Sequence, residues 1–154
     1  MTTLTRPDGY SLSSDPARLD VDAIHAFLTT SYWATGIPKE VIERAIRGSL
    51  NFGVYHKDAQ VGFARVVTDE ATFAYLCDVY VLPEHRGRGL GKWMMEAVMS
   101  HPSLQGLRRL HLVTRDAHGL YAGFGFKALE TPDGHMEIRR RDVYRTPGDQ
   151  EVEK

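Results

Sequence analysis

Apolar positions near the N-terminus of the chain recur at the spacing of helices. Asp20 precedes a run over 21–28 in which apolar residues fall three and four positions apart, which predicts a helix capped by Asp20. Similar spacing predicts a second helix that begins at Pro38, a residue suited to a first helical turn, and ends at Gly48. A short strand is predicted over Tyr10–Ser13.

The apolar spacing then changes to two residues, which is typical of strands. Residues 50–56, 60–68 and 72–82 predict three strands joined by tight turns. The third is apolar on both faces, and such strands lie in the middle of a sheet that is covered on both sides. Strict alternation assigns one face of it to Ala74, Leu76, Asp78, Tyr80 and Leu82, and the other to Phe73, Tyr75, Cys77, Val79 and Val81.

The second half of the chain mixes the two spacings. A strongly amphipathic helix begins at Leu90 and stops at His101, before a short strand around Leu110–Leu112 and a short helix over His118–Phe124. The remainder predicts a final hairpin, 127–129 with 136–140, across Pro132, Asp133 and Gly134. The order of elements indicates an α/β (α+β) domain with a mixed central sheet flanked by helices.

Length and composition limit what this domain can be. The 154 residues predict one domain over 1–144 with a loose polar tail over 145–154, and the 42% hydrophobic and 25% charged content is that of a globular protein. A net charge of −1 offers no broad field for nucleic acid or anionic lipid. Neither a spanning run, a secretory signal, nor a metal-ligand spacing is evident, so we expect a cytoplasmic domain with no membrane partner and no metal.

A glycine-rich turn, Arg86–Gly91, lies between the third strand and the amphipathic helix. The first amides of a helix lack partners within it and the helix dipole adds positive charge there, so such a turn binds anions. Glycines let the backbone approach phosphate oxygens, and Arg88 and Lys92 add charge at the rim, as does Arg86. The common nucleotide motifs fail, because Lys92 replaces a required glycine and Trp93 a required Ser or Thr. The turn therefore predicts a phosphate or pyrophosphate site.

The run 79–91 resembles the signature of the GNAT superfamily of acyl-CoA N-acyltransferases. That signature is Arg or Gln, two residues, Gly, any residue, and Gly or Ala; its fixed places are filled by Arg86, Gly89 and Gly91. A second run, 114–126, is similar to a later motif of the family, with Tyr121 followed by Gly125 and Phe126. The resemblance covers about 10–140 and implies a mostly antiparallel sheet whose central strands splay apart.

Acetyl-CoA is the cosubstrate that the resemblance implies. In the family the pyrophosphate of CoA lies on the amides of the glycine-rich turn, and the pantetheine arm pairs with the main chain of the central strand. Asp116 stands where many members carry Asn. The cofactor-binding residues expected on this basis are Val79, Tyr80, Val81, Arg86, Gly87, Arg88, Gly89, Leu90, Gly91, Lys92 and Asp116.

Tyr121 and Asp78 are the catalytic candidates. By resemblance Tyr121 is the general acid for the departing thiolate, the alternative being a core tyrosine that anchors its helix. Asp78 is the one charged residue of its strand. It either accepts the proton of the amine as general base, or it has a structural role, in which it caps backbone amides at a bulge or pairs with Arg65. In the second case water serves as the base. Tyr32 and Trp33, between the first two helices, wall the acceptor pocket or pack the helix corner.

These features predict an acetyl-CoA-dependent N-acetyltransferase that moves an acetyl group to a primary amine by direct attack in a ternary complex. The alternative is a CoA-binding sensor or interaction module with the same fold and no turnover. The acceptor is either a small-molecule amine or a peptide amine, and nucleic acid is not an expected partner. An exposed last hairpin favours a homodimer.

Overall fold

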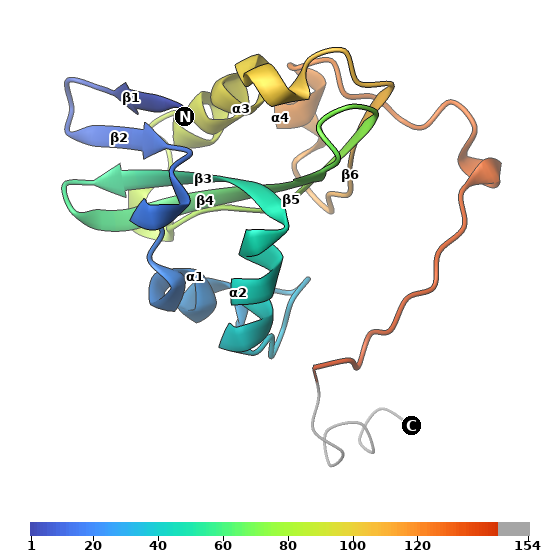
Figure 1. The fold of residues 1–154 in the computed structure, drawn as a ribbon, viewed down its shortest axis with the longest axis horizontal. Helices are drawn as coiled ribbons and strands as arrows, with labels where there is room; N and C mark the ends of the chain where they lie inside the picture. The colour runs from blue at the N-terminus through green and yellow to red at the C-terminus, as the bar shows by residue number, and fades with distance from the viewer. Residues whose placement is uncertain (145–154) are drawn as a thin grey trace.

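A six-stranded sheet with the strands in sequence order forms the centre of the protein, and the computed structural model describes it within residues 1–144 (Figure 1). The five strands β1 to β5 pair antiparallel, whereas β6 pairs parallel to β5, which confirms the mixed sheet. The loose tail predicted over 145–154 lies outside the described residues. The strands are β1 (Thr3–Thr5), β2 (Tyr10–Ser13), β3 (Ser49–His56), β4 (Ala59–Thr68), β5 (Phe73–Val81) and β6 (Arg109–Leu112).

Helices cover both faces of this sheet, with α1 and α2 on one side and α3 and α4 on the other (Figure 1). The predicted cap is confirmed, because the Asp20 side chain accepts a hydrogen bond of 3.0 Å from the amide of Ala23. Pro38 and Gly48 flank the second helix as expected. The helices are α1 (Val21–Leu28), α2 (Lys39–Arg47), α3 (Leu90–Ser100) and α4 (His118–Ala122), with single 3-10 turns at Pro16–Arg18, Pro83–His85, Pro102–Leu104 and Pro132–Gly134.

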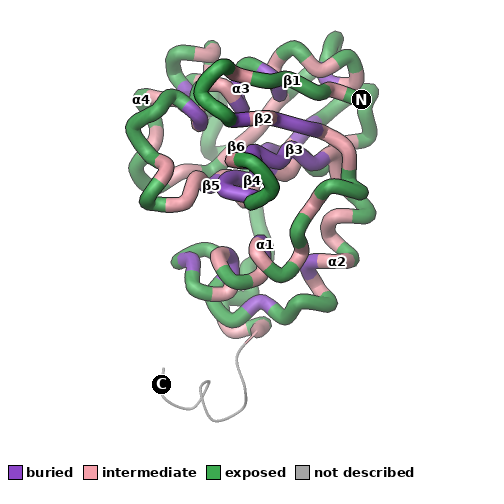
Figure 2. The backbone as a smooth tube through the Cα atoms, turned by 90° about the vertical axis from the view of Figure 1, so that its left-hand side faces the viewer, coloured by how far each residue is buried: buried purple, intermediate pink, exposed green. Residues whose placement is uncertain are grey.

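Two hydrophobic cores hold the layers together, and the central strands are the most buried part of the chain (Figure 2). The larger core joins α3 to the sheet through Met94 and Phe52, both fully buried. The smaller core joins α1 and α2 to the other face through Ile24 and Phe63. No helix within residues 1–144 is long and apolar enough to cross a membrane.

Strands β5 and β6 separate before β5 ends. Their pairing runs from Phe73 opposite Arg109 to Leu76 opposite Leu112 and stops there, while β5 continues to Val81. Within the described chain, residues 77–81 therefore have a strand neighbour only in β4. The predicted splay between the central strands is confirmed, and it leaves a gap beside the last half of β5.

A β-bulge at Asp78 interrupts the alternation of β5. Arg65 of β4 faces Cys77 of β5, and Phe63 faces Tyr80. Ala64, the one residue between Phe63 and Arg65, therefore opposes two residues of β5, Asp78 and Val79. Asp78 takes a left-handed backbone angle, φ +53°, which is uncommon outside glycine. The extra residue reverses the faces beyond it, so the predicted face assignment is wrong there: Val79 and Val81 pack on the larger core with Ala74 and Leu76, whereas Tyr80 lies in the smaller core.

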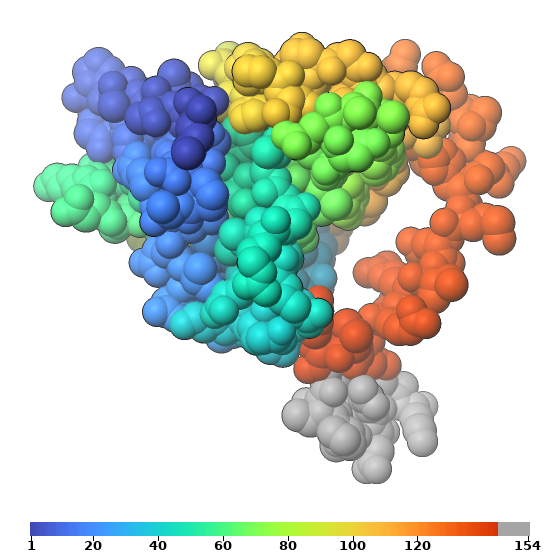
Figure 3. Space-filling model, viewed as in Figure 1, coloured from blue at the N-terminus to red at the C-terminus, as the bar shows by residue number. Residues whose placement is uncertain are grey.

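The final hairpin predicted over 127–129 and 136–140 is not formed. Residues 127–141, here called the C-terminal arm, are extended and exposed apart from the 3-10 turn at Pro132–Gly134, and they arch away from the sheet (Figures 1 and 3). Their only backbone hydrogen bonds within residues 1–144 close that turn. The arm returns to the body at Tyr144, which packs against the smaller core and whose carbonyl oxygen would lie 3.4 Å from a Cβ at Gly36. Because the two halves of the predicted hairpin lie on opposite sides of this arch, they have no strand partner in each other.

Candidate functional site

The glycine-rich turn joins the end of β5 to the start of α3. Gly87 and Gly89 take left-handed backbone angles, φ +79° and +76°, and nothing lies within 4 Å of the place where a Cβ would stand on either. Gly89 is also the N-terminal cap of α3. The sequence therefore needs glycine here for backbone conformation, and the turn presents bare backbone to open space.

Six consecutive amides, from Gly87 to Lys92, have no hydrogen-bond acceptor within the described chain. The first helical bond of α3 runs from the amide of Trp93 to the carbonyl of Gly89 at 3.0 Å. The first turn holds no acidic residue that could satisfy these donors. An 11-residue helix adds its dipole at this end, so the turn suits a doubly charged anion such as a diphosphate.

The basic side chains of the turn play different parts. The Nε of Arg86 donates to the Val81 carbonyl at 2.9 Å, which ties the turn to the end of β5. Arg88 and Lys92 are exposed and form no ion pair within the described chain, so their charge is available to a ligand. Beneath the turn, His85 Nδ1 lies 2.8 Å from the Tyr10 hydroxyl, an anchor that the sequence pattern did not reveal.

The gap between β5 and β6 leaves main-chain groups of β5 without a strand partner on that side. The amide of Leu82 bonds to Val61 of β4 at 2.8 Å, and successive strand residues point their amides to opposite edges. Val81 and Val79 consequently direct theirs into the gap. Tyr80 does not share this position, because its main chain faces β4 and its ring stacks on Phe27 with centroids 4.0 Å apart.

Tyr121 lies on α4 and is 8% exposed. Burial raises the pKa of its phenol, with smaller contributions from Tyr32 and Asp116, so the group stays protonated at neutral pH. Its hydroxyl makes no hydrogen bond within the described chain, yet it is not among the fully enclosed unpaired polar atoms, so the oxygen reaches open space. A protonated phenol with a free oxygen can donate a proton to a ligand.

Asp78 is the centre of a polar network on the α1 side of the sheet. Its two carboxylate oxygens accept hydrogen bonds from Trp33 Nε1 at 2.9 Å and from Arg65 Nε at 2.7 Å. Arg65 extends the network to the Ser49 hydroxyl at 3.0 Å. Burial acts against the charge of Arg65, but the neighbouring Asp78 carboxylate raises the pKa of that guanidinium, so Arg65 stays charged. Of the two structural alternatives considered for Asp78, the pair with Arg65 is present; Asp78 also lies at a bulge, but its carboxylate accepts no hydrogen bond from a backbone amide within residues 1–144.

Tyr32 and Trp33 stand at the corner between α1 and α2. They are 53% and 39% exposed, unusual for large aromatic residues, and their rings meet edge to face at 5.0 Å. The guanidinium of Arg115 lies 3.8 Å from the centroid of the Tyr32 ring, which joins this corner to the segment that leads into α4. Asp116, predicted to contact the cofactor, is exposed there and forms no ion pair within the described chain.

The predicted residues thus form two groups and a bridge. The turn and the gap-facing main chain of β5 make one surface, and the aromatic corner with Asp78 makes another. Tyr121 lies close enough to Tyr32 for that residue to contribute to its raised pKa, and its neighbour Leu120 on α4 would lie 3.8 Å from a Cβ at Gly91 of the turn. Arg115 and Ser49 are additional members that sequence reasoning missed. Arg115 could have been found from its place within the second motif, whereas nothing in the sequence pointed to Ser49. No group of three or more potential metal ligands occurs in residues 1–144.

Comparisons with known proteins agree with this arrangement. A family model described as the acetyltransferase (GNAT) domain matches residues 47–128. A candidate acetyltransferase of Gibberella zeae is 37% identical over an alignment of 163 positions that covers 87% of this chain and 91% of that protein.

Solved structures show the same fold. The crystal structure of a candidate GNAT-family acetyltransferase from Xanthomonas campestris superposes with a TM-score of 0.87 at 51% identity, over 89% of this chain and 97% of that one. N-acetylglutamate synthase from Neisseria gonorrhoeae, solved with coenzyme A and L-arginine, shares the fold with a TM-score of 0.65 at 19% identity, over 89% of this chain and 31% of that one. On the family match and these identities, the chain belongs to the GNAT acetyltransferase family.

Proposed function

We propose that the protein transfers the acetyl group of acetyl-CoA to a primary amine by direct attack within a ternary complex. The observation that carries this proposal is the continuity of two features: six amides in the glycine-rich turn that have no partner within the described chain, and an edge of β5 over residues 77–81 that has no strand neighbour. A diphosphate fits the first, and an extended amide-containing arm fits the second. Coenzyme A is a ligand class with both parts joined, and the Neisseria neighbour was solved with it.

In this proposal the chain holds the cosubstrate by its backbone. The amides from Gly87 to Lys92 bind the diphosphate, with Arg88 and Lys92 at the rim. The main chain of Val79 and Val81 pairs with the pantetheine amides as an added strand would. Acetyl-CoA then supplies an activated acyl group as a thioester at the inner end of the gap.

Two groups of the chain, the Val79 amide and the Tyr121 phenol, act on the reacting thioester. The amine nitrogen attacks the acyl carbon, the C–N bond forms, and the C–S bond breaks. The Val79 amide, at the bulge and directed into the gap, stabilises the negative charge that develops on the carbonyl oxygen. Tyr121 donates its phenolic proton to the leaving sulfur, a role supported by its hydroxyl, which makes no hydrogen bond within the described chain and is not fully enclosed.

The amine must lose a proton to attack, since an alkyl ammonium of pKa about 10.4 is almost wholly charged at neutral pH. Asp78 or water accepts it. Both oxygens of Asp78 already accept hydrogen bonds from Trp33 and Arg65, which favours water as the proton acceptor and a positioning role for Asp78. The acceptor, a small amine or a peptide amine, enters beside the aromatic corner of Tyr32 and Trp33.

A coupled pair of measurements tests the proposal. Calorimetry with CoA reports binding, and release of free CoA from acetyl-CoA in the presence of an amine panel reports transfer. We expect binding in the micromolar range and acceptor-dependent CoA release. Binding without release for any small or peptide amine would support the alternative, a CoA-binding module without turnover. Absence of binding at millimolar CoA would overturn both.

A further inference from the structure

The Arg115 guanidinium lies over an aromatic ring and keeps its hydrogen-bond donors free. Its central carbon is 3.8 Å from the centroid of the Tyr32 ring. A guanidinium that covers the face of a ring still presents its N–H groups at its rim, in the planar fork that matches a carboxylate. Within the described chain Arg115 forms no ion pair, and its side chain donates no hydrogen bond. The group is therefore a supported cation with an unused set of donors.

The turn that leads into α4 holds Arg115 in place. The Thr114 hydroxyl accepts a hydrogen bond of 3.0 Å from the Ala117 amide, which closes this turn around the arginine. Tyr32, in the segment between α1 and α2, supports the guanidinium from the other side. Arg115 therefore presents its donors at a defined place, beside the aromatic corner.

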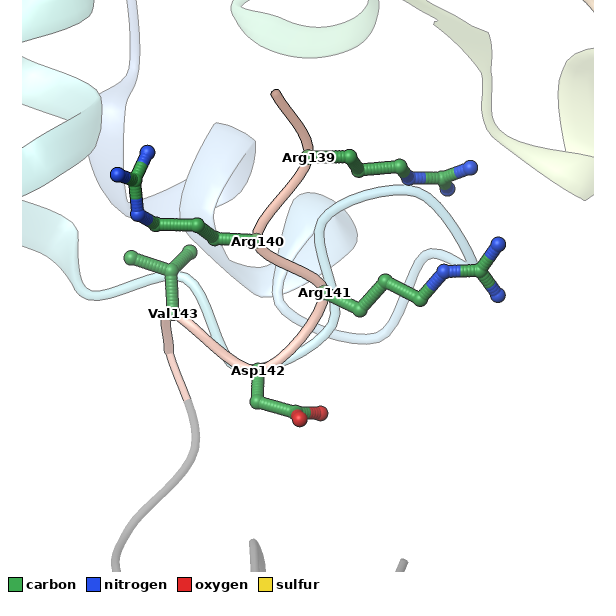
Figure 4. Close-up of a pocket in the computed structure, with 5 residues that line it drawn as sticks. All are labelled: Arg139, Arg140, Arg141, Asp142 and Val143. Carbon is green, nitrogen blue, oxygen red and sulfur yellow. The ribbon is translucent and has the colours of Figure 1, made fainter. Parts of the chain in front are cut away.

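The three consecutive arginines at the end of the C-terminal arm lack such support. Arg139, Arg140 and Arg141 extend from the arm, and Arg140 is directed away from the other two (Figure 4). None of the three lies over an aromatic ring within residues 1–144. A side chain that is free to rotate loses more entropy on binding a ligand than one already held in place. These arginines therefore do not form a carboxylate site comparable to Arg115.

The positive charge of Arg115 is not balanced by the acids near it. The Asp78 carboxylate already pairs with Arg65 at 2.7 Å, so those two charges offset each other. Asp116 forms no ion pair with Arg115, and it lies close enough to Tyr121 to contribute to the raised pKa of that phenol. The aromatic corner therefore has an uncompensated positive charge at its edge.

One line of contacts joins Arg115 to the bulge in β5. The Tyr32 ring under the guanidinium meets the Trp33 ring edge to face at 5.0 Å, and the Trp33 indole donates to Asp78 at 2.9 Å. A ligand along this line has aromatic surface beside its middle, with Arg115 at one end and the bulge at the other. A second cation fits poorly, because Arg115 occupies the face of Tyr32 and repels positive charge.

We infer that the acceptor is an amine that also carries a carboxylate, which Arg115 binds while the amine lies at the bulge in β5. The inference rests on the proposed function, whose acceptor it identifies by chemical class. One guanidinium balances a single negative charge, so it suits a carboxylate better than a phosphate dianion. Two sources supply this chemistry: a free amino acid, and a peptide whose N-terminal residue has an acidic side chain.

Matched acceptors measure the contribution of the carboxylate. Release of CoA from acetyl-CoA is followed with free amino acids and their amides, and with two tripeptide amides that begin with Asp and with Asn. We expect the acid of one of these two sets to exceed its uncharged partner in kcat/KM by about 10- to 100-fold, as a charge-assisted hydrogen bond does. The set that shows the preference identifies the source.

Variants of Arg115 assign this preference to one side chain. Arg115→Met keeps an apolar stem on the Tyr32 ring, and we expect the preference to fall to about threefold or less, mostly through KM. Arg115→Lys keeps the charge without the planar fork and is expected to retain an intermediate preference. The matched control Arg109→Met removes an exposed arginine at the start of β6 and is expected to keep the natural preference. A preference that survives in Arg115→Met would overturn the assignment.

Binding without turnover separates this inference from the proposed function. The same acceptors are titrated by calorimetry into the full chain in the presence of CoA, which has no acetyl group to transfer. We expect the acid to bind about 10-fold tighter than its uncharged partner, and this difference to disappear in Arg115→Met.

The outcomes of the two assays differ in what they overturn. Equal binding of acids and uncharged partners, binding of neither, or equal use of amides, simple amines or polyamines as acceptors would each overturn the inference. Equal use would at the same time leave acetyl transfer intact. Acid-selective binding without CoA release from acetyl-CoA would support the carboxylate site and contradict the proposed transfer.

Discussion

Trp33 Nε1 donates a hydrogen bond of 2.9 Å to Asp78 Oδ1, which joins the corner between α1 and α2 to the bulge in β5. The two residues are 45 positions apart in the sequence. One belongs to the aromatic corner proposed to face the acceptor, and the other lies at the bulge in the part of β5 that has no neighbour in β6. In the proposed mechanism the contact therefore couples the position of the acceptor to the position of the thioester.

Replacing Trp33 with Phe removes the N–H donor and keeps an aromatic ring. Because Trp33 is 39% exposed, the bond is screened by solvent, and we expect the KM for the amine to rise about 3- to 10-fold. The affinity for CoA is expected to stay the same, since the glycine-rich turn is untouched. Steady-state kinetics measure the KM for the amine, and calorimetry on the same preparation measures the affinity for CoA. An equal weakening of amine KM and CoA affinity would contradict the coupling.

Two variants of Asp78 distinguish a base from a positioning residue. Asp78→Asn keeps an oxygen for Trp33 and a residue type that tolerates the left-handed φ of +53°, but it cannot accept a proton. With water as the base, we expect kcat to fall about 10-fold and the acidic limb of the pH–rate profile to remain. Loss of that limb, with a fall of 100-fold or more, would instead make Asp78 the base.

Asp78→Gly is the companion variant. Glycine adopts the bulge conformation without strain, so the backbone is preserved while both hydrogen bonds disappear. Arg65, whose side chain is 18% exposed, then keeps its charge without a carboxylate, and we expect a loss of stability of about 1–3 kcal/mol in urea unfolding. A variant as stable as the natural chain would show that Ser49 and water compensate.

Locally encoded features could be read from the sequence. The cap at Asp20, the helix limits at Pro38 and Gly48, and the glycine-rich turn each depend on a few adjacent residues whose backbone preferences are strong. The separation of β5 from β6 entered through the family resemblance and is present in the pairing.

The effect of the bulge on the faces of β5 could not be predicted. The lone charge of Asp78 in an apolar strand allowed a bulge as one alternative, but strict alternation still placed Val79 and Tyr80 on the wrong faces, because the position of an inserted residue is set by the register against β4. The last hairpin failed for a related reason. The pattern of 136–140 is that of a strand, but a strand exists only where a neighbour pairs with it, and residues 136–140 have no strand neighbour within residues 1–144.

Tyr121→Phe removes the proposed acid and retains the ring that packs edge to face on Phe126 at 6.0 Å. We expect kcat to fall at least about 10-fold while CoA affinity changes little. The leaving thiolate then lacks its proton donor, so we expect the loss in kcat with every amine acceptor. A matched control is Tyr75→Phe, which removes a half-buried phenol from the part of β5 that pairs with β6 and should leave kcat within about twofold. Unchanged kcat in Tyr121→Phe would remove it from the mechanism.

Buried phenols predict a loss of stability in alkali. Burial raises the pKa of Tyr55 to about 12, and it also raises that of Tyr75 and Tyr121. Above pH 10 the unfolded chain releases phenol protons that the folded chain retains, so stability is complete below pH 10 and falls as the pH rises toward 12. Each such phenol lowers the free energy of unfolding by at most about 1.4 kcal/mol per pH unit above pH 10, and solvent screening reduces this value.

Urea unfolding at pH 8, 10 and 11 measures this loss, and Tyr55→Phe is the informative variant. Its hydroxyl is enclosed and makes no hydrogen bond within residues 1–144, so the substitution should cost little at pH 8. It should also flatten the decline above pH 10 relative to the natural chain. An identical decline in the variant would assign the effect to other groups.

Gly89→Ala and Gly106→Ala form a matched pair that isolates anion binding from backbone strain. The two glycines have nearly equal left-handed angles, φ +76° and +73°, and both face open space, so alanine costs each a similar strain of about 1–2 kcal/mol. Only Gly89 lies among the unpartnered amides at the start of α3. We expect Gly89→Ala to weaken CoA binding about 10-fold or more, because the new Cβ stands where phosphate oxygens approach, whereas Gly106→Ala binds CoA as the natural chain does. Equal binding by both variants would mean that the turn does not hold the diphosphate, and equal weakening would mean that lost stability alone explains the change.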